Sequence, residues 1–161
     1  MSENLGIFGT TTLALALLLS GCSSTSNEAS SSTAVDTCQT ASEEDLKNIN
    51  EGMKSSKFQV ESGFVADFNA DDVAEIKMVF PTYKSPRIFA ANIPVADGKP
   101  VVGLWGIQDF DYGWRITALD EQTKKYSNLG ADISDSSATG RVNAVMLELS
   151  ANTNVLSCLK K

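Results

Sequence analysis

The sequence contains no histidine among its 161 residues. The imidazole ring is the usual general base of Ser-His-Asp and Cys-His catalysis and a common zinc ligand. Its absence therefore excludes these forms of nucleophilic catalysis and most zinc sites. No Gly-x-Ser-x-Gly motif or phosphate-binding loop is present either. We therefore predict a non-catalytic protein without a cofactor.

Positive charge is also scarce. The chain has 13 Lys and Arg against 20 Asp and Glu, which gives a formal net charge of −7. Proteins that bind nucleic acid neutralise phosphates with Lys and Arg, so this balance predicts no nucleic-acid partner. The length allows one globular domain with tails.

A hydrophobic run long enough to span a bilayer is missing. Residues 5–19 are uncharged and mostly apolar, but a spanning helix needs about 20 apolar residues to cross ~30 Å of hydrocarbon. The run instead has the length of the apolar segment of a secretory signal peptide. The residues before it contain Glu3 and no Lys or Arg, which is unusual for such a peptide.

The run ends in Leu19-Ser20-Gly21-Cys22. This tetrapeptide resembles the lipobox of bacterial lipoproteins, in which an aliphatic residue and two small residues precede an obligatory cysteine. The resemblance implies that residues 1–21 are a signal peptide cut before Cys22. It also implies a diacylglyceryl group on the Cys22 sulfur and further acylation, for example with palmitate, on its new amine. An ordinary signal peptide with an incidental cysteine and a buried core helix remain as alternatives.

The resemblance predicts a protein that is lipid-anchored on the extracytoplasmic face of the cell membrane. Two or three acyl chains hold a protein on a bilayer, whereas its acidic body would be repelled by anionic headgroups. The anchor alone would therefore provide the attachment. Nine of the fifteen residues from 23 to 37 are Ser or Thr, so residues 22–37 are predicted to form a lipidated, flexible tether.

Only three cysteines are present. With Cys22 acylated, Cys38 and Cys158 remain, and an even number of thiols in an exported protein favours a disulfide. This bond would close a single domain of residues 38–161. Two buried free thiols or a thiol catalyst are the alternatives, although there is no Cys-x-x-Cys spacing.

The start of this domain predicts an amphipathic helix. Ser42 with Asp45, and Thr40 with Glu43, fit the capping-box pattern. Apolar residues then recur at the helical spacing of one face. These residues are Leu46, Ile49 and Met53.

Residues 58–80 are ambiguous. Asp72 is placed to cap a helix, but Ile76, Met78 and Phe80 alternate as in a strand. We favour a strand at the end of this segment.

The rest of the chain predicts an antiparallel meander followed by helices. Asp97-Gly98 is a strong hairpin signal, and the expected strands are residues 88–95, 101–107 and 114–119. Asp120 is expected to cap a helix that stops at Gly130. A last helix at 142–149 should break near Asn152. We expect an α+β fold, a small antiparallel β-meander with the N-terminal and C-terminal helices packed on one face.

The tract from Arg87 to Gly130 is similar to small exported lipoproteins of actinobacteria. The matching features are a Gly-x-Trp strand, an Ile-x-x-Leu-Asp step into a helix, and a Ser-x-x-Gly end. They correspond to Gly103 and Trp105, residues 116–120, and residues 127–130. The resemblance implies the location and fold and carries no activity.

One oxygen-rich segment has part of the spacing of a calcium loop. Asp67, Asn69 and Asp71 occupy the first, third and fifth positions, but Asp72 replaces the required Gly and Met78 the required Glu. A helix cap or a solvated acidic turn is the better interpretation, and no metal site is predicted.

A second acidic segment lies at a predicted turn. Asp109 and Asp111 alternate with Phe110, Tyr112 and Trp114, and carboxylates beside aromatic rings can form a sugar subsite. Turns also collect Asp and Gly, and strand aromatics usually fill the core. The predicted anchor, the flexible tether and the lack of catalytic residues favour a non-catalytic domain that binds an envelope protein or a cell-wall polymer. The alternatives are a carboxylate-based glycan binder or hydrolase and a carrier of a small apolar ligand.

Overall fold

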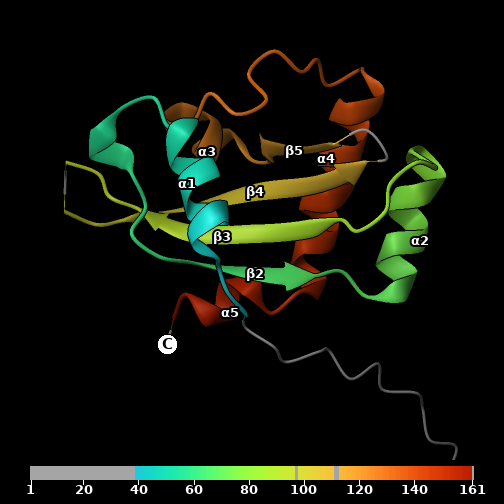
Figure 1. The fold of residues 1–161 in the computed structure, drawn as a ribbon, viewed down its shortest axis with the longest axis horizontal. Helices are drawn as coiled ribbons and strands as arrows, with labels where there is room; N and C mark the ends of the chain where they lie inside the picture. The colour runs from blue at the N-terminus through green and yellow to red at the C-terminus, as the bar shows by residue number, and fades with distance from the viewer. Residues whose placement is uncertain (1–38, 97, 111–112, 161) are drawn as a thin grey trace, which may run out of the picture. The chain divides into compact units, whose positions relative to one another are not determined.

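The structure is a computed structural model that describes residues 39–96, 98–110 and 113–160 (Figure 1). The predicted signal peptide, the tether, Cys22 and Cys38 lie outside these ranges and remain predictions. None of the helices in the described ranges is both long enough and apolar enough to cross a membrane.

The described strands form one antiparallel sheet in which each strand pairs with the next along the chain. The strands are β1 (Gln39–Thr40), β2 (Gly63–Asp67), β3 (Arg87–Ile93), β4 (Val101–Phe110) and β5 (Gly113–Ala118). This order confirms the predicted meander. The turn between β3 and β4 contains Gly98 at φ +85°, a conformation that favours glycine. β2 was not recognised as a separate strand in the sequence.

The first helix, α1 (Glu43–Glu51), begins as predicted. Ser42 is its N-cap, and its Oγ accepts a hydrogen bond from the backbone N–H of Asp45 at 3.1 Å. The carboxylate of Asp45 accepts in return from the backbone N–H of Ser42 at 3.3 Å. The capping box thus uses Ser42 and Asp45, the second of the two predicted pairs.

The strand favoured at the end of residues 58–80 is wrong, because this segment forms helix α2 (Ala70–Val79). Asn69 caps the helix by accepting from the backbone N–H of Asp72 at 2.9 Å. Ile76 is fully buried while Met78 is 79% exposed. The alternation that suggested a strand therefore has no structural counterpart. A short 3-10 turn, η1 (Ser56–Phe58), precedes β2.

The C-terminal helices form where the sequence predicts them, but two of their ends differ: the helix capped by Asp120 ends early, and the last helix begins at Ala138 instead of residue 142. Asp120 caps α3 (Glu121–Tyr126), but this helix ends before Gly130, which has φ +76° in the following turn. The last predicted helix is α4 (Ala138–Leu149). It passes through η2 (Ser150–Asn152) into α5 (Val155–Cys158), which confirms the break near Asn152.

The α+β class is confirmed, but the expectation that helices cover one face is wrong. Helices pack on both faces of the sheet, so α1 lies in front of it and α4 behind it in Figure 1. The reason is visible in β3, whose side chains are apolar on both faces. Phe89 and Ile93 join the core beneath α1 and α3, whereas Ile88 and Ala90 join the core beneath α2, α4 and α5.

Candidate functional site

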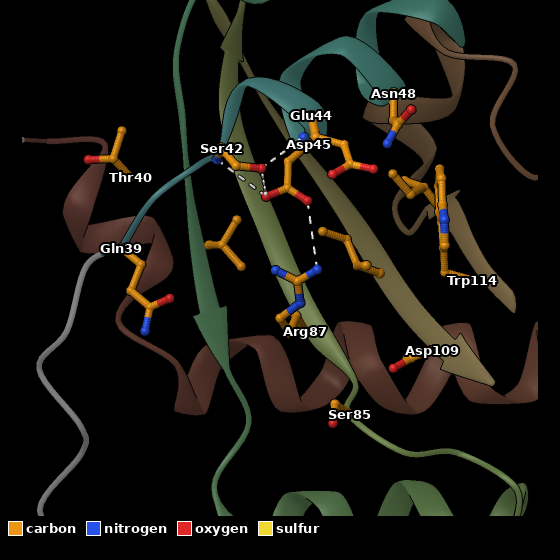
Figure 2. A pocket seen from close by; sticks show the side chains of 13 residues that line it. Gln39, Thr40, Ser42, Glu44, Asp45, Asn48, Ser85, Arg87, Asp109 and Trp114 are labelled. Carbon is orange, nitrogen blue, oxygen red and sulfur yellow. Dashed lines mark hydrogen bonds and ion pairs between the residues drawn. The ribbon is translucent and has the colours of Figure 1, made fainter. Parts of the chain in front are cut away.

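A hollow of about 430 Å³ lies beside the N-terminal part of α1, over one end of strands β3, β4 and β5 (Figure 2). We call it the α1–sheet hollow. Its lining comes from β1, α1 and the strand ends, and nine of its thirteen residues are polar or charged. The lining residues are Gln39, Thr40, Ser42, Glu44, Asp45, Asn48, Val65, Ser85, Arg87, Ile107, Asp109, Trp114 and Ile116.

The strand register builds the floor of the hollow. Arg87 pairs with Ile107 and Ile107 pairs with Ile116, so these three form a row across β3, β4 and β5. Asp109 pairs with Trp114 one step further along the same face. Side chains paired across antiparallel strands have Cβ atoms roughly 5 Å apart, so the carboxylate and the indole are neighbours.

Helix α1 provides the opposite wall. Glu44 and Asn48 are one helical turn apart and share a face of the helix. In Figure 2 both side chains, together with that of Asp45, extend from α1 on the side of the hollow opposite Asp109 and Ser85. The site therefore combines residues from distant parts of the sequence.

An ion pair joins the wall to the floor. The guanidinium Nη2 of Arg87 lies 3.7 Å from Oδ1 of Asp45. The other oxygen, Oδ2, accepts a hydrogen bond from the hydroxyl of Ser42 at 2.7 Å. Asp45 thus both caps α1 and fastens its first turn to β3, and its charge is compensated by Arg87.

Trp114 is the large aromatic side chain that lines the hollow, and it is 53% exposed. The described members of the predicted aromatic and acidic cluster lie on two different faces of the sheet. Asp109 and Trp114 line the hollow, while Asp111 and Tyr112 lie outside the described residues. Phe110 points to the other face, where it is buried in edge-to-face contact with Phe80 and Tyr83.

Of the nine polar residues that line the hollow, only Asp109 was recognised in the sequence as a site residue, and Glu44, Asp45, Asn48 and Arg87 are among those that were not. The sequence predicted Asp45 as part of a capping box, and this prediction is confirmed. Glu44 and Asn48 have the i, i+4 spacing of residues that share one face of a helix. No sequence spacing relates α1 to the start of β3. Their proximity results from the packing of the helix on the sheet.

The calcium-like segment is part of a helix cap. The backbone N–H of Asp72 donates to Asn69, as described above. The carboxylate of Asp72 in turn accepts hydrogen bonds from Nδ2 of Asn69 at 2.8 Å and from Nδ2 of Asn152 at 3.0 Å. Within the described ranges, no group of three or more His, Cys, Asp or Glu side chains is arranged to hold a metal ion. The interpretation as a helix cap is confirmed.

Cys158 lies in α5, which packs against β2 and β3. The residue is buried, and its sulfur lies 3.0 Å from the carbonyl oxygen of Asn154. Its predicted partner Cys38 directly precedes β1, which pairs with β2. Because Cys38 is outside the described residues, the disulfide stays a prediction.

The clearest pKa shifts belong to a surface pair on α3, outside the hollow. Nζ of Lys124 donates a hydrogen bond to Oε1 of Glu121 at 2.9 Å. This bond and the charge of Lys124 lower the pKa of Glu121, and the same bond raises the pKa of Lys124. The pair is solvent-exposed and stabilises α3 only slightly.

Comparison of the chain with models of known protein families gives no match, and comparisons with curated proteins and with solved structures give none either. The function proposed below therefore rests on the resemblance of residues 19–22 to a lipobox, on the fold and on the hollow.

Proposed function

We propose that this protein is an exported lipoprotein whose α+β domain binds a partner in the cell envelope without catalysing a reaction. Acyl chains on Cys22 hold it at the extracytoplasmic face of the cell membrane. The α1–sheet hollow is the binding site. The similarity of the N-terminal residues to a lipobox supports the anchor, and the exposed indole of Trp114 supports the site.

The two tryptophans of the chain show why Trp114 carries this proposal. Trp105 is fully buried, packs edge-to-face on Phe89, and donates a hydrogen bond from Nε1 to Oγ of Ser127 at 3.3 Å. Trp114 is half exposed at a concave surface instead. An indole is among the side chains that contribute most to binding when a partner covers it.

The lining favours a polar partner over a small apolar ligand. Val65, Ile107 and Ile116 contribute apolar atoms to the hollow, but each is at least 95% buried in the core. An apolar ligand would also remove water from the polar lining, and it could not replace the hydrogen bonds that the lining makes to water. A carbohydrate of the cell wall remains a second candidate because Asp109 stands beside Trp114 on one face.

Site-specific photo-crosslinking in intact cells tests the proposed function. Lys47 lies on the exposed surface of α1, next to the residues that line the hollow, and a photoreactive side chain there should capture the partner. The same side chain at Met78, on α2, is the matched control. We expect an adduct from position 47 that is absent from position 78 and is lost when Trp114→Ala is added.

An adduct at position 47 that survives Trp114→Ala would contradict a role for the hollow. Identical adducts from positions 47 and 78 would do the same, since helix α2 belongs to the other face of the sheet. Circular dichroism of the Trp114→Ala variant serves as the folding control. Its side chain is outside both cores, so the spectrum should be unchanged.

A further inference from the structure

The charge of the α1–sheet hollow indicates the kind of ligand it takes. Three carboxylates line it, those of Glu44, Asp45 and Asp109, against one guanidinium, that of Arg87. The ion pair between Arg87 and Asp45 cancels two of these charges. In the part of the chain that the structure describes, Glu44 and Asp109 form no ion pair. The hollow therefore holds two uncompensated negative charges.

The indole of Trp114 adds a second feature of the same sign. The face of an aromatic ring carries negative potential and attracts cations, and tryptophan does so most strongly. Asp109 is the cross-strand partner of Trp114, so a carboxylate and a ring face are presented side by side. Glu44 approaches from the opposite wall, on α1 (Figure 2).

We propose that the α1–sheet hollow binds an alkylammonium group, with the cation against Trp114 and between the carboxylates of Asp109 and Glu44. This inference rests on the proposed function and names the ligand class of that site. A primary ammonium supplies three hydrogen-bond donors to a lining that already holds carboxylate acceptors.

Other ligand classes fit these observations less well. An anionic ligand would meet two uncompensated carboxylates, and Arg87 is already paired with Asp45. A neutral saccharide would stack on Trp114 but would bring no positive charge to pair with the carboxylates of the hollow. The same chemistry occurs in a free amine and in a lysine side chain of an envelope protein, and the experiment includes a probe for each source.

Isothermal titration calorimetry of the full chain in a polyoxyethylene detergent tests the proposal. The probes are n-butylamine, Nα-acetyl-lysine amide, its neutral Nα,Nε-diacetyl form, and N,N′-diacetylchitobiose. We expect the two amines to bind and the two neutral compounds not to bind. Binding of the lysine amide without binding of n-butylamine would identify a lysine side chain as the source.

The variants measure each contribution. Asp109→Asn and Glu44→Gln should each weaken amine binding about fivefold, and Trp114→Ala about tenfold. Trp114→Phe keeps an aromatic face and should stay within about threefold of the native protein. Glu75→Gln is the matched control, because it removes one exposed carboxylate from α2 on the other side of the sheet. It should leave binding unchanged.

Three results would overturn the proposal. Binding of the chitobiose with no effect of Asp109→Asn would mean a neutral glycan instead. Failure of both amines to bind, while Trp114→Ala still abolishes the crosslink from position 47, would reject the ammonium but keep the proposed function. If Trp114→Ala leaves both amine binding and the crosslink from position 47 unchanged, the hollow is rejected as the site of both.

Discussion

Three polar side chains lie between the sheet and α4, in the core opposite the hollow. Gln108 and Thr117 are fully buried. Oδ1 of Asn143, on α4, accepts a hydrogen bond from Nε2 of Gln108 at 2.6 Å and another from Oγ1 of Thr117 at 2.8 Å. One amide oxygen thus satisfies donors on two neighbouring strands and ties them to the helix.

Asn143→Ala should destabilise the domain by about 1–3 kcal/mol, because the buried hydroxyl of Thr117 loses its acceptor and Nε2 of Gln108 loses its shorter bond, keeping the 3.3 Å bond to that hydroxyl. Urea denaturation followed by circular dichroism measures the change. Glu148→Ala, at an exposed position of the same helix, is the control and should change the unfolding free energy by less than about 0.5 kcal/mol. Equal midpoints for the two variants would show that the cluster does not stabilise the fold.

Among the helices, α1 has its start determined by a residue that also contacts the sheet. Asp45 completes the capping box through Ser42 and pairs with Arg87 on β3. The two roles are separable by substitution. Asparagine keeps an acceptor for Ser42 and loses the charge, whereas alanine loses both.

Asp45→Ala should therefore destabilise the domain more than Asp45→Asn does. The cap is worth about 1 kcal/mol and the partly exposed ion pair less than that. Thermal unfolding of both variants measures the difference, with Glu43→Ala in the same exposed first turn as the control. Equal destabilisation by the two variants would mean that the ion pair, and not the cap, fixes the start of α1.

The elements that the sequence predicted well are those with local signals. Helices α1, α3 and α4 have a capping residue followed by helical spacing, and the β3–β4 hairpin has a turn signal. Helix α2 was misjudged because Ile76, Met78 and Phe80 also fit a strand. The decisive evidence is its cap at Asn69, which the sequence offered only as part of a calcium-like spacing.

Two properties of the whole molecule were beyond local signals. The coverage of both faces follows from apolar residues on both sides of β3, a pattern that is equally compatible with a strand buried in a larger sheet. The sequence predicted only the part of the site on β4 and β5, because Asp109 and Trp114 are close in the sequence. Arg87 and Asp45 meet only after α1 packs on the sheet.

At the scale of the whole protein, Cys22→Ser should abolish membrane attachment. Without the sulfur there is no site for diacylglyceryl transfer, and the remaining acidic chain would not bind anionic lipid. Metabolic labelling with a fatty-acid analogue, followed by fractionation, should show loss of label and release of soluble protein. A Cys22→Ser variant retained in the membrane with Met1 intact would indicate an uncleaved hydrophobic anchor.

The two helical layers have a consequence for how such a protein diversifies. With both broad surfaces of the sheet covered by its own helices, the proposed binding is left to the strand ends and the exposed side of α1. Trp114 and Asp109 sit at such ends and belong to neither hydrophobic cluster. On the proposed function, replacing them would change what the domain binds with little effect on folding, so this scaffold could take a different ligand without a change of fold.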